Sequence, residues 1–144
     1  MDANALFNMG QEVLRSQAFS RLLGTKLVAF LPGTAVLEIP ITDHLLQQNG
    51  FVHGGVLSYA ADNALTFVGG SILGSNVLTS EYKINYLKPA IGQTLIARAS
   101  VVYAGKRQAV CRCEVFTING QSKESLCATA LGTIVAIASE STNA

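Results

Sequence analysis

The sequence predicts one α+β domain in which a curved antiparallel sheet wraps around a long central helix. Residues 54–70 are apolar almost throughout, which is typical of a helix buried inside a protein. Four strand-like segments follow this stretch at short intervals, and a helix and a strand hairpin precede it. This separation of strands from helices indicates the α+β class. The 144 residues, 49% of them apolar, suffice for one substantial core but not for two ordinary domains, so we treat residues 1–144 as a single domain.

The N-terminal part is predicted to be an amphipathic helix over about residues 4–23. Apolar side chains recur there at roughly helical spacing, and Gly24 is a suitable stop because glycine commonly ends helices. The core of the domain is then expected over about residues 25–138.

The segment between the two helices is predicted to contain a hairpin and a loop. Strand-like runs at residues 26–30 and 34–41 are joined by a turn that contains Pro32 and Gly33. Residues 42–52 carry glutamines, an asparagine and a glycine, and predict a connection without regular structure.

The central helix is expected to be narrow, because alanine and glycine make up much of its surface and let a curved sheet approach closely. Gly69-Gly70 and residues 74–76 are expected to release the chain from the helix. The turn at residues 118–121 contains Asn-Gly, the signature of a tight hairpin. The strands are predicted at residues 77–87, 94–103, 108–117 and 122–137.

The charge balance argues against polyanionic partners. Ten basic and nine acidic residues are spread along the chain, so the net charge of +1 indicates neither nucleic-acid nor membrane-surface binding. Only 13% of residues are charged, which suggests that an oligomer covers part of the surface. Residues 1–4 lack the features of a secretory signal and no run is long enough to span a membrane, so we expect a soluble cytoplasmic protein.

The cysteines are expected to be buried thiols. Cys111 and Cys113 are separated by one residue in a strand-like segment, so both face the same side of the sheet. A metal site would need more sulfur or histidine ligands than the two histidines, His44 and His53, can add at useful spacing, so none is predicted.

Residues 52–64, VHGGVLSYAADNA, resemble the central-helix signature of the phenylacetic-acid-pathway (PaaI-type) hotdog-fold thioesterases. Residues 80–90, SEYKINYLKPA, are similar to the third strand of that family and its exit. The resemblance covers roughly residues 5–138. It implies a hotdog fold, hydrolysis of an acyl-coenzyme A (acyl-CoA) by water without a cofactor, and an active site shared by two subunits of a homodimer, with a homotetramer as an alternative.

The resemblance also implies roles for individual residues. The family uses a backbone N–H at the position of Gly54 to polarise the thioester carbonyl and a carboxylate at the position of Asp62 as base or nucleophile. Six residues before the histidine, the family has an asparagine where this chain has Gln47, and the nearest asparagine here is Asn49. A Ser or Thr that positions water in some members corresponds to Thr79.

These residue types suit thioester hydrolysis, which places negative charge on the carbonyl oxygen. A helix that starts near Gly54 offers free N–H groups and the positive end of its dipole to that oxygen. Asp62 lies eight residues further on, roughly 12 Å along a helix axis, so the two groups cannot act on one carbonyl within one chain. Two antiparallel copies of the helix would bring Gly54 of one subunit near Asp62 of the other. The sequence leaves open whether Asp62 attacks directly or activates water.

The remaining candidates have weaker support. His53 is expected to orient the loop, and the Gly54-Gly55 pair is as consistent with a tight turn as with substrate contact. The aromatic ring of Tyr59 is a candidate for the acyl pocket, although core packing is the usual role of such residues. Three cationic side chains in turns are candidates for binding the phosphates of CoA: Lys88, Lys106 and Arg107. The alternative is that they are simply solvated.

Two rival functions remain on sequence grounds. A hotdog hydratase acting on acyl thioesters would be expected to have a histidine a few residues after the helix aspartate, and no histidine follows His53. A non-catalytic acyl-CoA binding or sensing module would retain the fold and the pocket without turnover. We therefore predict a thioesterase that acts on a small, medium-chain or aromatic acyl-CoA.

Overall fold

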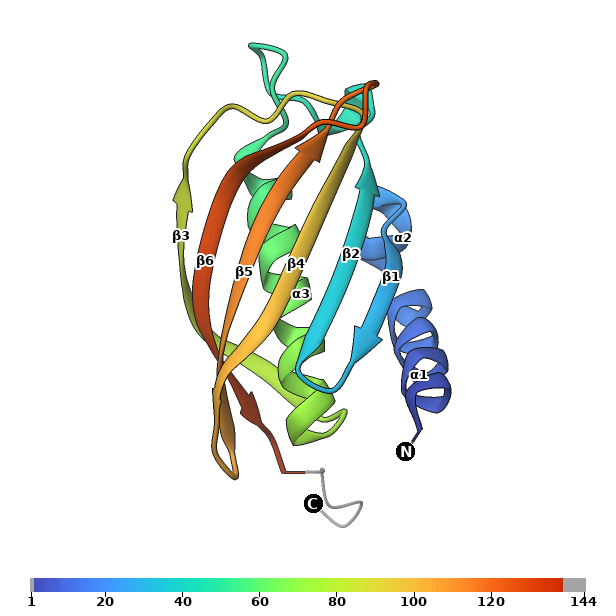
Figure 1. Cartoon of the computed structure of the whole chain (residues 1–144), viewed down its shortest axis with the longest axis vertical. Coiled ribbons are helices and arrows are strands. Elements are labelled where there is room, and N and C mark those ends of the chain that lie inside the picture. Colours follow the sequence, from blue (N-terminus) through green and yellow to red (C-terminus); the bar gives the residue numbers. More distant parts are fainter. Residues whose placement is uncertain (1, 139–144) are drawn as a thin grey trace.

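The computed structural model describes residues 2–138 and has the predicted α+β architecture (Figure 1). Two short helices come first, a hairpin and a loop follow, and one long helix precedes four long strands. In chain order the elements are α1 (Ala3–Ser16), α2 (Ala18–Leu23), β1 (Lys26–Leu31), β2 (Thr34–Pro40), the short 3-10 helix η1 (Asp43–Leu45), α3 (Gly54–Leu73), β3 (Val77–Tyr86), β4 (Thr94–Ala104), β5 (Gln108–Ile118) and β6 (Glu124–Ala136).

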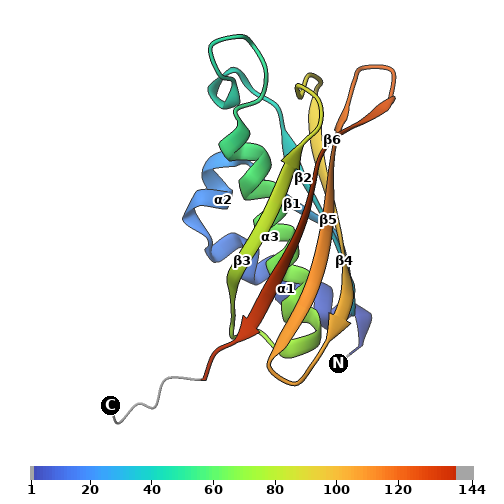
Figure 2. The same ribbon diagram turned by 90° about the vertical axis from the view of Figure 1, so that its left-hand side faces the viewer.

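The six strands form one antiparallel sheet in the order β1-β2-β4-β5-β6-β3. Although β3 directly follows α3 in sequence, it pairs with β6 at the far side, so β1 and β3 are the two edges. The sheet curves around α3, and α1 packs on β1 at the opposite edge from β3 (Figures 1 and 2). The curved sheet around a central helix was predicted from the sequence and is confirmed.

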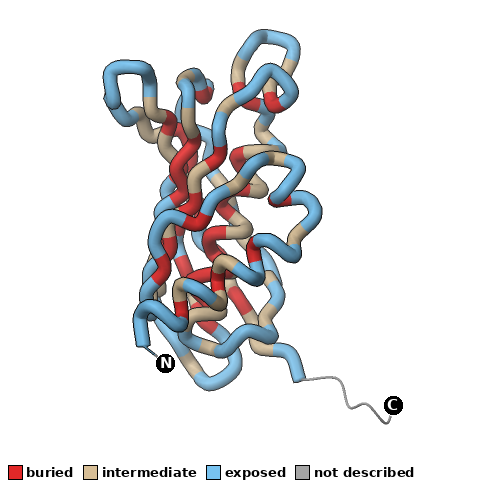
Figure 3. The backbone as a smooth tube through the Cα atoms, turned by 90° about the vertical axis from the view of Figure 1, so that its right-hand side faces the viewer, coloured by how far each residue is buried: buried red, intermediate tan, exposed pale blue. Residues whose placement is uncertain are grey.

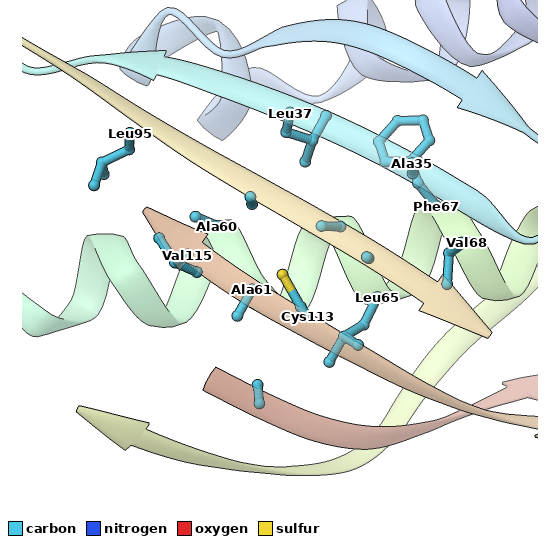
Figure 4. Close-up of a cluster of buried hydrophobic side chains, with 14 of the residues drawn as sticks. Ala35, Leu37, Ala60, Ala61, Leu65, Phe67, Val68, Leu95, Cys113 and Val115 are labelled. Atoms are coloured by element: carbon cyan, nitrogen blue, oxygen red, sulfur yellow. The ribbon is translucent and has the colours of Figure 1, made fainter. Parts of the chain in front are cut away.

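The core lies between α3 and the concave face of the sheet. The buried side chains of the helix include Ala60, Ala61 and Leu65, which face residues such as Leu37 and Val115 of the sheet (Figure 4). Burial is concentrated along this contact, and the loops at both ends of the molecule are mainly exposed (Figure 3). Because the side chains on the helix are small, the sheet wraps closely around it.

Gly69 marks the closest approach of α3 to the sheet. A Cβ atom on Gly69 would lie 2.6 Å from Cβ of Ile134 on β6, which is closer than packed atoms allow. This contact explains why a glycine occupies position 69 inside the helix. The prediction that Gly69-Gly70 release the chain is wrong, because α3 continues through both residues to Leu73. The helix ends one turn later, at Gly74, whose φ of 103° favours glycine.

The N-terminal segment differs from the prediction of one helix over residues 4–23. It consists of α1 and α2, which are separated at Gln17, where φ is −84° and ψ is 106°. The Gln17 side chain accepts hydrogen bonds from Ser20 Oγ (2.5 Å) and from Asn63 Nδ2 on α3 (3.0 Å). These contacts favour a break at Gln17, which helical periodicity alone does not reveal. The predicted stop at Gly24 is confirmed as the left-handed cap of α2.

The strand predictions agree with the structure to within about two residues at each end, but one turn differs. Asn119 and Gly120 do not form a two-residue hairpin. The loop spans residues 119–123, and the only non-glycine residue among residues 2–138 with positive φ is Ser122, at 59°. The Asn119 side chain accepts hydrogen bonds from the N–H groups of Gln121 (2.9 Å) and Lys123 (3.0 Å), so it stabilises the longer loop.

The three cysteines are free and buried, as predicted. Cys111 and Cys113 both point from β5 into the core. Burial raises the pKa of Cys111 to about 11, and burial together with the nearby Glu114 carboxylate raises that of Cys113 to about 12. Both thiols are therefore protonated and poor nucleophiles at neutral pH.

Because of the close approach at Gly69, substitution by alanine should affect stability differently at Gly69 and at Gly70. We expect Gly69→Ala to lower the free energy of unfolding by about 1–3 kcal/mol, because the added methyl group overlaps Ile134. At Gly70 an added Cβ meets its nearest neighbour, Val77, at an ordinary 3.5 Å. Gly70→Ala should therefore raise stability by up to about 1 kcal/mol through helix propensity. Urea unfolding of both variants measures this difference, and equal effects would contradict the packing described here.

Candidate active site

The first turn of α3 leaves one backbone donor free. His53 is the N-cap: its Nδ1 accepts a hydrogen bond from the Gly55 N–H (2.8 Å), and its carbonyl accepts from the Val56 N–H (2.9 Å). The N–H of Gly54 has no hydrogen-bond partner among residues 2–138. The donor of Gly55 is thus occupied by the cap, whereas that of Gly54 remains available at the positive end of the helix dipole.

The loop before α3 is held in place by backbone hydrogen bonds. The N–H of His53 bonds to Leu45 O (2.8 Å), and the N–H of Val52 bonds to Ala90 O (3.0 Å), which ties the start of α3 to the segment after β3. The Gln47 side-chain oxygen accepts a hydrogen bond from the N–H of Asn49 within a tight turn. These contacts fix the position of the loop relative to Gly54.

A pocket of about 320 Å³ lies at this end of α3. Gln47 and Gly54 line it together with Lys88, whereas Asn49 is exposed at the turn and is not among the lining residues. Tyr86, at the end of β3, also lines the pocket, and its hydroxyl group donates to Gly54 O (3.2 Å). Tyr86 was not among the site residues predicted from the sequence, although it belongs to the strand motif that carries the family resemblance.

Asp62 lies in the middle of α3 and is half-buried. Its Oδ1 accepts a hydrogen bond from Thr79 Oγ1 (2.6 Å), while its second carboxylate oxygen has no partner in the described part of the chain. Thr79 lies on β3 where the pairing with β6 shifts register, between Thr79 and Glu81. The structure thus joins two residues that the sequence had singled out separately. Thr66, one turn after Asp62, also contacts Thr79 (Oγ1 to Oγ1, 2.9 Å) and was not predicted.

Gly54 and Asp62 do not meet within one chain. They belong to a single uninterrupted helix, so their separation of eight residues corresponds to about 12 Å along its axis. One chain therefore has an available N–H donor at one place and a carboxylate with an uncommitted oxygen at another.

A second pocket, of about 160 Å³, lies beneath α1 and beside the Asp62 turn of α3. Asn63 and Thr66, which follow Asp62 by one and four residues, line it together with apolar side chains. Its other lining residues are Met9, Gly10, Val13, Gln17, Phe30, Phe67, Gly70, Ser75 and Val77. The pocket is therefore mostly apolar, with amide and hydroxyl groups on one side.

In the described part of the chain, none of the other predicted contact residues hydrogen-bonds to the Gly54 N–H or to the Asp62 carboxylate. The Tyr59 hydroxyl hydrogen-bonds to Ser20 (2.6 Å) and Thr25 (2.8 Å), so it ties α3 to α2 and the start of β1. Lys106 and Arg107 are exposed in the turn between β4 and β5, at the opposite end of the sheet from Lys88 (Figure 1). A single chain does not gather these three cations.

Neither metal ligands nor a membrane span is found in residues 2–138. No group of three or more His, Cys, Asp or Glu side chains there has a spacing that could hold a metal ion. Within the same range, none of the helices combines the length and apolar character required to cross a bilayer.

Comparisons with known proteins agree with the fold and the motif. The family model described as Thioesterase superfamily matches residues 49–124. A protein of Saccharolobus solfataricus named as an esterase is 30% identical over 125 residues, which cover 86% of this chain and 81% of that protein. The acyl-coenzyme A thioesterase PaaI of Escherichia coli is 31% identical over 109 residues, covering 75% of this chain and 76% of PaaI.

Solved structures of thioesterases are also similar to this chain. The crystal structure of a thioesterase family protein from Silicibacter pomeroyi aligns with a TM-score of 0.85 and 31% identity, covering 89% of this chain and 95% of that one. The structure of E. coli PaaI aligns with a TM-score of 0.82 and 25% identity, covering 94% and 96% of the two chains. The chain therefore belongs to the thioesterase superfamily, is an enzyme with the hotdog fold, and is PaaI-like within that family.

Proposed function

We propose that the protein hydrolyses acyl-CoA thioesters at a site that combines Gly54 of one subunit with Asp62 of the other. The observation that carries this proposal is the pair of uncommitted groups on α3: the Gly54 N–H without a partner and the Asp62 carboxylate with one free oxygen. The name of the E. coli relative, an acyl-coenzyme A thioesterase, supports the choice of substrate class.

The two groups divide the chemistry of hydrolysis between them. The Gly54 N–H stabilises the negative charge that develops on the thioester oxygen, at a helix start where glycine lets the substrate approach closely. Asp62 either accepts a proton from water or attacks the carbonyl carbon itself, and CoA leaves as the thiol in both cases. Thr79 holds one carboxylate oxygen of Asp62, which leaves the other directed to the reaction.

A two-fold dimer would bring the Gly54 N–H of one subunit close to the Asp62 carboxylate of the other. β3 is an open edge strand with exposed apolar side chains, Leu78 at 57% and Tyr86 at 54% of their accessible surface, and such edges tend to pair with another strand. Antiparallel pairing of two β3 strands sets two α3 helices antiparallel, so that Gly54 of each approaches Asp62 of the other. The result is two identical sites per dimer.

The two pockets fit the two halves of the substrate. The pocket beneath α1 takes the acyl group next to Asp62, and its volume of about 160 Å³ is close to that of an apolar cavity that binds benzene. This size favours a short acyl chain or a single ring. The pocket lined by Gly54 and Gln47 binds the pantetheine arm of CoA, which then passes Lys88. In the antiparallel dimer, the turn with Lys106 and Arg107 of the other subunit lies toward the same end, where the CoA phosphates need cations.

The test is release of free thiol from a panel of short, medium-chain and aromatic acyl-CoAs. We expect turnover by the wild-type protein and a loss of about 10²–10⁴-fold for Asp62→Asn, which retains an acceptor for Thr79 but removes the charge. Gly54→Pro should cost about 10²–10³-fold, because it removes the N–H.

Gly54→Ala is the matched control for Gly54→Pro, because it retains the donor and its Cβ meets Tyr86 at an ordinary 3.5 Å. Proline is well tolerated at the first residue of a helix, and His53, with ψ of 136°, has the extended conformation that a following proline requires. If no acyl-CoA releases thiol, or if the folded Asp62→Asn protein retains full turnover, the proposal is wrong.

A further inference from the structure

Thr66 connects the carboxylate region to the pocket beneath α1. Its Oγ1 donates to the backbone oxygen of Asp62 (2.8 Å) and lies 2.9 Å from Oγ1 of Thr79, and the residue lines the pocket. A hydrogen bond from a threonine to the carbonyl four residues earlier is common in helices and implies no function. The second contact, to a hydroxyl that itself binds the Asp62 carboxylate, is specific to this site.

The second contact sets the direction in which the Thr79 hydroxyl donates its proton. The hydroxyl groups of Thr66 and Thr79 have one proton each but take part in three hydrogen bonds. Because the carboxylate is the strongest acceptor among them, the Thr79 hydroxyl donates to Asp62 Oδ1. In the contact between the two hydroxyls, Thr66 is then the donor and Thr79 the acceptor, with the Thr66 proton shared with the Asp62 carbonyl. Thr66 therefore stabilises the orientation in which Thr79 donates to Asp62.

Within residues 2–138, the side chain of Thr79 has no other hydrogen-bond partner than Thr66 and Asp62. Thr79 also lies on the edge strand, at the register shift, where the ladder constrains it less than in a central strand. Without Thr66, the Thr79 hydroxyl is held by one hydrogen bond only, and other side-chain rotamers become accessible.

We infer that Thr66 is a positioning residue for the hydrolysis: it fixes the Thr79 hydroxyl and, through it, the Asp62 carboxylate. This inference rests on the proposed function of Asp62. Because Thr66 also lines the pocket assigned to the acyl group, the occupant of that pocket contacts the residue that orients the carboxylate.

The kinetic test uses Thr66→Val, which has nearly the same shape but no hydroxyl, and Thr66→Ser, which retains the hydroxyl. We expect kcat of Thr66→Val to fall about tenfold, the effect of one hydrogen bond of about 1.4 kcal/mol, with little change in KM. Thr66→Ser should recover most of the wild-type kcat. Thr133→Val, which removes a hydroxyl bonded to Glu81 on the outer face of the sheet, is the control and should leave kcat unchanged.

A second readout needs no substrate. Three-bond NMR couplings to the Thr79 methyl carbon report its χ1 rotamer in the ligand-free protein, and the denaturation midpoint of each variant confirms that it is folded. We expect couplings of a single rotamer in wild type and Thr66→Ser, and averaged couplings in Thr66→Val. If Thr66→Val does not fold, Thr66→Ala takes its place in both measurements.

The outcomes separate the two proposals. Unchanged kcat together with an unchanged Thr79 rotamer in Thr66→Val overturns the role of Thr66, even when the wild-type protein is an active thioesterase. If the wild-type protein releases no thiol but Thr66→Val still averages the Thr79 rotamer, the proposed function fails while the positioning of Thr79 by Thr66 stands.

Discussion

The close contact between α3 and the concave face of the sheet is the constraint on which the other features depend. At Gly69 the helix backbone approaches Ile134 so closely that no side chain fits between them, and the alanines of the preceding turns allow similar proximity. A sheet can curve tightly around a helix only when that helix is narrow. Protein interiors pack as densely as crystals of small molecules. This contact therefore fixes the position of α3 along its own axis and its rotation about that axis.

Because α3 is fixed in this way, the groups along it have defined positions. The helix start carries the Gly54 N–H, and the half-buried face toward β3 carries Asp62, where Thr79 can reach it. An adjacent side of the helix contacts Gln17 and α2 through Asn63 and Tyr59, and Asn63 lines the pocket beneath α1. One helix thus holds the Gly54 N–H and the Asp62 carboxylate about 12 Å apart along its axis, and we propose that a second subunit brings the two groups together.

Much of this arrangement was predictable because it depends on local sequence. The apolar stretch and the turn residues located the central helix and the strands, and the family resemblance drew attention to Gly54, Asp62 and Thr79. The features that the sequence did not reveal arise from contacts between distant segments. The break at Gln17 depends on Asn63, 46 residues away.

The site was predictable to a lesser degree than the fold. Thr66 is four residues from Asp62 and so on the same face of α3, but its contact with Thr79 depends on how β3 returns to the far edge of the sheet. Tyr86 meets Gly54 through the same return of the chain. The use of Gln47 rather than Asn49 in the pocket depends on a tight turn that residue types alone do not define.

We propose that each active site takes Gly54 from one subunit and Asp62 from the other. This arrangement can be tested with a hybrid dimer of one Gly54→Pro subunit and one Asp62→Asn subunit, isolated through two different affinity tags. In the shared-site account the hybrid has one site with both groups intact, so its thiol release should rise far above that of either parent homodimer. A hybrid no more active than its two parents would contradict the account, because it would mean that Gly54 and Asp62 act within one chain.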